Sequence, residues 1–185
     1  REKLGQIVRV LLICGAAAAA LGLTLYFLPE TLSERALSAL RVFNYPAGGV
    51  LRYIEDNPAN PQRAISTSVD PNVLGGLLAM IGGLLAPQLL NPKPVLGSRW
   101  LTYPAFGIVL TCLVLTFSRG AMAALAVALV GLALARYRRL LWIVAAVALV
   151  IILLPVTQAY VAHFVEGVQA QDLVPMPAQD LPVRS

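Results

Sequence analysis

The residues best suited to chemistry are two arginines that lie at or just before the beginning of an apolar segment. Arg63 opens the stretch RAISTSVDPN (residues 63–72), and Arg119 lies in the SRG stretch of residues 118–120. Arginine carries a permanent charge on a planar fork that binds phosphate oxygens in bidentate fashion. The alternative is that both side chains simply extend from an apolar surface towards water, as arginines do at membrane interfaces. A phosphate-binding site is one of two interpretations open for this pair.

Three polar residues beside the arginines, Asp70, Asn72 and Ser118, are candidates for binding the same group. Asp70 also has a structural explanation, because Asp followed by Pro is typical of an N-cap and the first residue of a helix. For Asp70 alone we favour that explanation. The sequence has no zinc-ligand spacing, no phosphate-binding P-loop and no nucleotide-binding fingerprint, so we expect neither a metal nor a soluble cofactor.

The composition indicates which solvent surrounds these residues. Of 185 residues, 58% are hydrophobic and 12% are charged, and the mean hydropathy is +0.77. Soluble domains are roughly 45–50% apolar and about 25% charged, so a water-soluble globule is excluded. The net charge of +5 does not indicate nucleic-acid binding, because the basic residues lie between apolar blocks and not on one solvated face. Cys14 and Cys112 fall inside apolar runs and are interpreted as packing residues.

Five apolar runs qualify as membrane spans, for which about 20 residues are needed. They cover residues 7–28, 72–90, 101–117, 121–135 and 140–160. The expected fold class is therefore all-α, a multi-pass transmembrane helical bundle. A single helix over residues 101–135 would be about 52 Å long and would place Arg119 in mid-membrane, at roughly 2.5–3.5 kcal/mol. We therefore predict a tight helical hairpin with Arg119 at its tip.

The unequal distribution of lysine and arginine between the connections predicts the orientation in the membrane. One side carries one acid and eight basic residues, a balance of +7: Arg1, Lys3, Arg9, Lys93, Arg99, Arg136, Arg138 and Arg139. The other side carries six arginines and eight acids, a balance of −2, and it includes Arg63 and Arg119. We expect the chain to lie in the plasma or inner membrane of a cell, with the first side facing the cytoplasm. Residues 29–71, 118–120 and 161–185 then lie on the outer face.

The outer segment 29–71 is a long loop, and such loops in compact proteins are usually functional. Its first part is predicted to be an amphipathic helix that lies flat on the outer leaflet and starts at a capping box over residues 31–34. The expected apolar face consists of Leu32, Ala36, Leu37, Leu40 and Phe43. An equally open interpretation is that this helix covers the bundle. A second short helix is predicted over residues 50–55, ended by the NPANP stretch at 57–61.

Glycines punctuate the second span. Gly75, Gly76, Gly82 and Gly83 recur seven residues apart, so they share one helix face. Small residues on a helix face allow another helix to approach closely in a membrane. This pattern predicts packing and carries no chemistry.

Two motifs, R-x6-DPN at the start of one span and L-T-x-S-R-G at the following hairpin, resemble those of the O-antigen ligase and polymerase superfamily of bacterial envelope glycosyltransferases. The matching stretches are Arg63 to Gly76 and Leu115 to Met122, and the resemblance covers roughly residues 60–170. Family members have many more spans. This chain does not start with Met and ends in a Pro-rich polar segment, so we expect it to be an internal fragment.

The resemblance implies metal-independent transfer of a glycan from a polyprenyl pyrophosphate carrier to an acceptor hydroxyl, on a glycan or a lipid, at the outer face of the membrane. Arg63 and Arg119 match the arginines that hold the pyrophosphate and stabilise its charge as it leaves. The general base of the family is a histidine in a large outer loop, which here begins near residue 161 and is expected to continue past Ser185. His163 is the only histidine, but it lacks the family's surrounding pattern, so the chain by itself is expected to be inactive.

Two other functions stay open. A transporter of a small anion such as bicarbonate is one, because the same superfamily domain occurs in proteins once proposed to handle bicarbonate. Transporters normally carry ionisable residues within their spans, and these spans have none apart from Arg9 at an edge. A membrane scaffold without chemistry is the other, and it would suit the outer helix and the glycine face. An intramembrane serine protease is excluded because no span contains a histidine.

Overall fold

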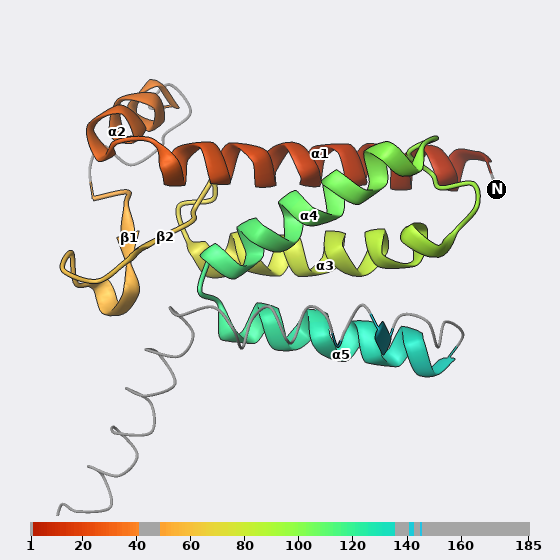
Figure 1. Cartoon of the computed structure of the whole chain (residues 1–185). Helices are drawn as coiled ribbons and strands as arrows, with labels where there is room; N and C mark the ends of the chain where they lie inside the picture. Colours follow the sequence, from red (N-terminus) through yellow and green to blue (C-terminus); the bar gives the residue numbers. More distant parts are fainter. Residues whose placement is uncertain (1, 41–48, 136–140, 143–144, 146–185) are drawn as a thin grey trace, which may run out of the picture. The chain divides into compact units, whose positions relative to one another are not determined.

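The computed structural model describes residues 2–40, 49–135, 141, 142 and 145 (Figure 1). The chain divides into two compact units, residues 1–144 and 145–185, and every element described below belongs to the first. In chain order these elements are α1 (Glu2–Phe27), α2 (Glu30–Ser38), β1 (Arg52–Tyr53), the 3-10 helix η2 (Ile54–Asp56), β2 (Gln62–Arg63), α3 (Pro71–Leu90), α4 (Arg99–Leu115) and α5 (Arg119–Ala135). The mainly helical architecture expected from the sequence is confirmed.

Two helices are long and apolar enough to cross a membrane, α1 over Lys3–Phe27 and α3 over Pro71–Leu90. α4 and α5 are apolar too, but each has 17 residues, or about 25 Å of helix, which is short of a full hydrocarbon core. The predicted span over residues 140–160 lies almost wholly outside the described residues, as does everything expected from residue 161 onwards. Helix length and composition thus support two spans, and the five-span bundle stays a prediction.

Hydrogen-bonding side chains fix where two of the helices begin. Oδ1 of Asp70 accepts a hydrogen bond of 2.7 Å from the backbone N–H of Asn72, and Pro71 occupies the first helical position of α3. The predicted N-cap is therefore confirmed. Ser98 caps α4 in the same way, because its Oγ accepts from the backbone N–H of Trp100 at 3.2 Å.

The tight turn that the sequence predicts before Arg119 connects α4 to α5, although α5 then packs on α3 and hardly on α4. α4 ends at Leu115 and α5 begins at Arg119, so only three residues connect them. Phe117 has a φ of 51°, a left-handed conformation that is uncommon for a side chain of this size. The hydroxyl of Thr116 accepts a hydrogen bond of 3.3 Å from the backbone N–H of Ser118 within this turn. Arg119 consequently lies at the turn and not in the middle of a long helix.

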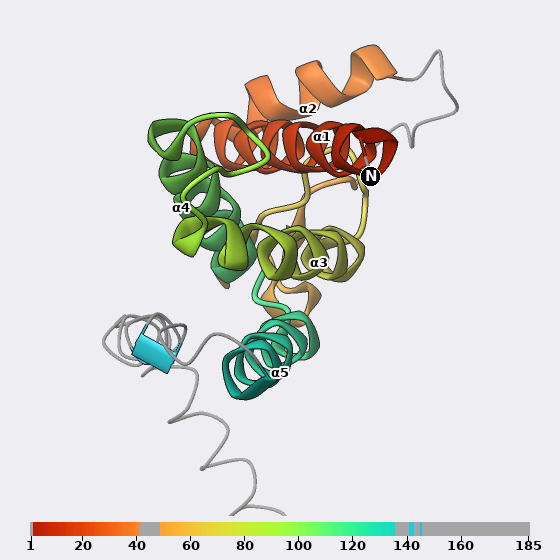
Figure 2. The same ribbon diagram turned by 90° about the vertical axis from the view of Figure 1, so that its right-hand side faces the viewer.

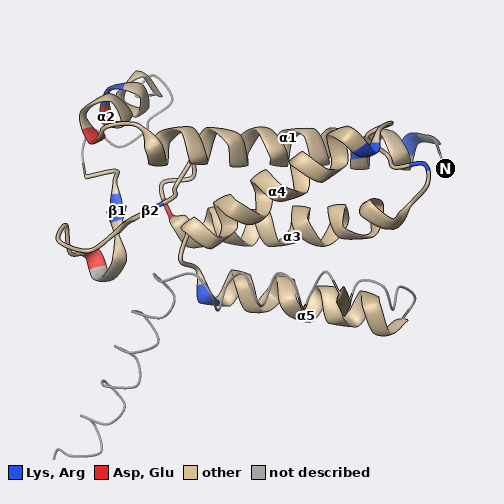
Figure 3. Ribbon diagram, in the orientation of Figure 1, with Lys and Arg blue, Asp and Glu red and all other residues tan. Residues whose placement is uncertain are grey.

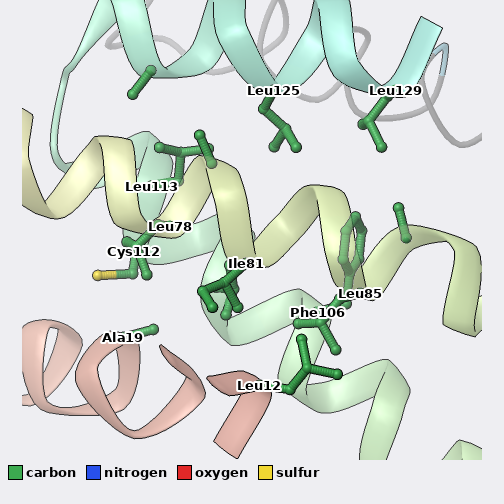
Figure 4. Packing of buried hydrophobic residues seen from close by; sticks show 14 of the residues in the cluster. Leu12, Ala19, Leu78, Ile81, Leu85, Phe106, Cys112, Leu113, Leu125 and Leu129 are labelled. Carbon is green, nitrogen blue, oxygen red and sulfur yellow. The ribbon is translucent and has the colours of Figure 1, made fainter. Parts of the chain in front are cut away.

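α3 is the central helix of this unit. It packs on α1, α4 and α5, and α1 also packs on α4, which runs diagonally past α1 and α3 in Figure 1. Figure 2 shows α1 and α5 on opposite sides of α3. Buried side chains from these four helices meet in one core, including Leu12, Leu78, Leu113 and Leu125 (Figure 4). The ends of α1 and α4 and the starts of α3 and α5 lie at one end of the bundle, together with α2, β1 and β2 (Figure 1).

The close approach of α5 to α3 depends on two of the four glycines. A Cβ added to Gly75 would lie 2.9 Å from Cβ of Ser118, and one added to Gly82 would lie 3.3 Å from a methyl group of Leu125. A Cβ added to Gly76 would meet no atom within 4 Å, and one added to Gly83 would lie 3.9 Å from Cβ of Ala128. The predicted packing face is confirmed for Gly75 and Gly82. Gly83 lies at its edge, with room for a methyl group beside Ala128, and the prediction is wrong for Gly76, because one residue turns the helix by about 100°.

α2 exists, but its start and its buried face differ from the prediction. The helix begins after a proline and has no side-chain cap, so the predicted capping box is wrong. Leu37 is buried as expected, whereas Ala36 is exposed, Leu32 is 46% exposed and Ser33 is buried instead. The reason is contact with the end of α1, where the Ser33 hydroxyl donates a hydrogen bond of 2.8 Å to the Leu25 carbonyl oxygen. A separate apolar cluster consists of Leu25, Leu37, Val50, Leu51 and Ile65. α2 therefore covers the end of α1, which was the second interpretation of this helix.

Residues 50–55, predicted as a helix, form β1 and the start of η2 instead. β1 pairs with β2 in antiparallel fashion, with Arg52 opposite Arg63 and Tyr53 opposite Gln62. The predicted break at residues 57–61 is confirmed, since it is the turn between the two strands. The helix prediction is wrong because a two-residue strand carries no recognisable periodicity without its partner. The last residue of the expected apolar face, Phe43, lies outside the described residues.

The two cysteines differ in their surroundings. Cys112 is fully buried, as predicted, and a Cβ on Gly22 of α1 would lie 2.9 Å from its Sγ. Cys14 is exposed, so its interpretation as a packing residue is wrong. The apolar run around it could not reveal this, because α1 buries only one of its faces against α3 and α4.

Candidate functional site

The candidate site lies at the end of the bundle where α4 stops and where α3 and α5 start. Charged residues of the described chain gather at the two ends and leave the middle of the bundle uncharged (Figure 3). Lys3, Arg9 and Arg99 belong to the beginnings of α1 and α4, at the opposite end from Arg63 and Arg119. Among the described residues, these members of the two charge sets on which the orientation prediction rests are thus separated in space. Which end faces the cytoplasm stays a prediction.

Arg63 is held against the last carbonyl groups of α4. Its Nε donates a hydrogen bond of 2.8 Å to the Thr116 carbonyl oxygen, and its Nη2 donates one of 3.0 Å to Oδ1 of Asn72. The backbone N–H of Ala64 donates to the Leu115 carbonyl oxygen at 2.8 Å. The last carbonyls of a helix lack partners within it, and a cation is favourable at this negative end of the helix dipole. Two helices therefore orient the half-buried guanidinium.

Asn72 and Asp70 connect Arg63 to the start of α3. The side chain of Asn72 accepts from Arg63, while its backbone N–H donates to Asp70. Asp70 acts as the helix cap, in agreement with the structural explanation that we favoured for it. Asn72 therefore orients Arg63, a more specific role than the general contact with substrate that the motif suggests.

Ser118 and Arg119 are brought to the same place by α5. Ser118 is 5% exposed and packs against Gly75 in the second turn of α3. Arg119 is exposed and follows Thr116 by three residues, which limits the distance between their Cα atoms to about 11 Å. The carbonyl oxygen of Thr116 is the atom that binds Arg63. Hydrogen bonds thus join three of the predicted residues, Arg63, Asn72 and Asp70. The α4–α5 turn brings the other two, Ser118 and Arg119, to the same end of the bundle.

The backbone around Arg63 is strained. Ser66, Val69 and Phe117 have φ values of 51°, 63° and 51°, which are uncommon for residues other than glycine. The buried Ser66 hydroxyl also donates a hydrogen bond of 3.0 Å to the Ala18 carbonyl oxygen of α1. Such strain persists only where surrounding contacts impose it, and it concentrates at functional sites. α1, α3 and α4 together impose the conformation of this segment.

Tyr53 ties the ribbon of β1 and β2 to α2. Its hydroxyl donates a hydrogen bond of 2.9 Å to Oε1 of Glu30. Partial burial raises the pKa of Tyr53 above its ordinary value, and the hydrogen bond to Glu30 and the negative charges of Glu30 and Glu34 add to this rise. The ribbon that carries Arg63 is therefore anchored at both of its strands.

Two residues of this region were missed by sequence reasoning. Thr116 is buried and supplies both the carbonyl that binds Arg63 and a hydroxyl within the turn. Its polar character at the end of an apolar run is a signal that could have found it. Arg52 lies directly opposite Arg63, and no sequence signal reveals it, because the register of the two strands follows only from the folded chain.

Neither a metal site nor a known relative helps to define this site. Within the part of the chain that the structure describes, no three His, Cys, Asp or Glu side chains gather as ligands for a metal ion. Compared with protein-family models, curated proteins and solved structures, the chain shows no significant match. The resemblance to the O-antigen ligase and polymerase superfamily rests on the two short motifs alone.

Proposed function

We propose that the chain is part of a membrane glycosyltransferase of the O-antigen ligase or polymerase type. Such an enzyme transfers a glycan from a polyprenyl pyrophosphate carrier to an acceptor hydroxyl at the outer face of the membrane. The observation that carries the proposal is the orientation of Arg63, whose guanidinium is bound at 2.8 Å and 3.0 Å by groups from two helices. A cation fixed in advance stabilises developing negative charge without reorganising during the reaction.

The position of Arg63 suits a lipid-borne phosphate. α3 carries no charged residue along its 20 residues, and Arg63 is bonded to Asn72 in its first turn. If α3 crosses the membrane, this first turn lies where the hydrocarbon core meets the headgroups. A lipid pyrophosphate carries its charge at the same depth.

In the proposed reaction, the acceptor hydroxyl oxygen forms a bond to the anomeric carbon of the glycan. The bond from that carbon to the pyrophosphate oxygen breaks, and its electron pair stays on the pyrophosphate. Arg63 and Arg119 stabilise this added negative charge. The proton of the hydroxyl passes to a general base, which the resemblance assigns to a histidine of the outer loop.

Conservative substitutions in the intact enzyme test this assignment. We expect Arg63→Lys and Arg119→Lys each to lower the rate of glycan transfer by about 10²–10³-fold, because lysine lacks the planar fork. Arg35→Lys is the matched control, since this arginine lies in α2 at the same end of the bundle. The rate is measured in reconstituted vesicles with a polyprenyl-linked donor.

Two further measurements make this test decisive. Because Arg63 also bonds to the end of α4, the resistance of each variant to SDS unfolding is measured in parallel, and the rate is compared only between folded proteins. A normal transfer rate in either variant would refute the role of that arginine. Uptake of a small anion by vesicles that leave the donor unconsumed would instead identify a transporter.

A further inference from the structure

Arg52 is a charged residue beside Arg63 to which the proposed function gives no role. It is the direct partner of Arg63 in the antiparallel ribbon. Directly opposed residues in such a ribbon project from the same face, with Cβ atoms about 4.5–5.5 Å apart. Like charges in this arrangement repel and destabilise the pairing. Two arginines are therefore placed together where a neutral pair would give a more stable ribbon.

The ion pair between Arg52 and Asp56 is long and exposed. Oδ1 of Asp56 lies 3.8 Å from Nη1 of Arg52, and the two side chains are 83% and 44% exposed. Exposed ion pairs of this length contribute little to stability. A phosphate offers Arg52 two short, charge-assisted hydrogen bonds and is a better partner. Arg52 can exchange Asp56 for such a ligand at little cost.

We propose that Arg52 is a second binding residue for the diphosphate and acts together with Arg63. The guanidinium of Arg63 is oriented by hydrogen bonds to Asn72 of α3 and to Thr116 at the end of α4. Arg52 lies on β1, opposite Arg63 on β2. Arginines at two opposed positions of the ribbon provide one guanidinium group for each of two adjacent phosphates. A carboxylate or a single phosphate would engage only one of them. The site thus selects a diphosphate. This inference rests on the proposed function for the position of the ligand and adds a residue and a ligand preference to it.

Binding measurements on the full chain in nanodiscs test the role of Arg52. The probes are farnesyl diphosphate and inorganic pyrophosphate, each titrated by calorimetry into the wild type, Arg52→Gln, Arg63→Gln and the control Arg35→Gln. We expect Arg52→Gln and Arg63→Gln to weaken diphosphate binding by about tenfold or more, since each removes charge-assisted hydrogen bonds. The control should bind like the wild type. Tighter binding of the farnesyl compound identifies a lipid-borne ligand, and equal binding identifies a soluble one.

The stability of the ligand-free protein separates binding from a structural role. Arg52→Gln removes a repulsion, so the unliganded variant should resist SDS at least as well as the wild type. A variant that loses stability without ligand and keeps its affinity would show that Arg52 is structural and would overturn the inference. If Arg52→Gln bound diphosphate normally while Arg63→Gln did not, the role of Arg52 would be overturned and the proposed function would stand. A wild type that binds neither probe would overturn the proposed function as well.

Discussion

Adding a single methyl group to Gly75 tests whether the contact between α3 and α5 positions the candidate site. In Gly75→Ala the new Cβ would lie 2.9 Å from Cβ of Ser118, 3.0 Å from Cβ of Ala121 and 3.2 Å from Oγ1 of Thr116. A Cβ atom cannot rotate away from its backbone, so α5 and the preceding turn must shift. Overpacking of this kind costs about 1–3 kcal/mol.

Gly76→Ala is the matched control, because its new methyl group meets no atom within 4 Å. Both substitutions gain the same helix propensity, about 0.8–1 kcal/mol, so the difference between the two variants isolates the clash. We expect Gly75→Ala to unfold at a lower SDS fraction in mixed micelles than Gly76→Ala. The free energy of unfolding should be lower by about 1–3 kcal/mol. Far-UV circular dichroism follows the transition. Equal stability of the two variants would refute the close contact between the helices.

Two further outcomes follow from the surroundings of the site. The pKa of Tyr53 is raised in the folded protein. Above about pH 10 the unfolded chain therefore loses the Tyr53 hydroxyl proton before the folded protein does, so the free energy of unfolding falls as the pH rises. Tyr53→Phe should show a smaller decline than the wild type when SDS unfolding is compared between pH 9 and pH 11, and identical slopes would contradict the pKa shift. Asp70→Ala should lower the free energy of unfolding by about 1 kcal/mol while Asp70→Asn keeps the cap. If Asp70→Asn bound diphosphate poorly in the calorimetric assay, a role beyond capping would be required.

The helices of the bundle were predictable because their signals are local. The apolar runs define α1, α3, α4 and α5 to within a few residues at most boundaries, and the Asp70–Pro71 pair marks the start of α3. The turn before Arg119 followed from the cost of placing a charge in mid-membrane. Each of these inferences depends on residues that are close together in the sequence.

The ribbon and the contacts of Arg63 could not be predicted, because they join distant segments. Arg63 and Thr116 are separated by 53 positions, and nothing in either stretch names the other as its partner. Ser33 was placed in a predicted capping box and not on the buried face of α2, because a polar residue is buried there only through its hydrogen bond to the Leu25 carbonyl oxygen. The periodicity of apolar and polar residues cannot reveal a hydrogen bond from a side chain to the backbone of another helix.

The bonds between β2 and the end of α4 also impose an order on assembly. Arg63 and Ala64 leave the ribosome about 50 residues before the carbonyls of Leu115 and Thr116 that they bind. Membrane helices associate after they have inserted, so β2 can reach its final place only when α3 and α4 are both present. The proposed phosphate-binding site therefore forms only after α4 has been synthesised. A nascent chain stalled before Thr116 would expose an unanchored Arg63, and the proposed enzyme would acquire its donor site only once the α4–α5 turn has been made.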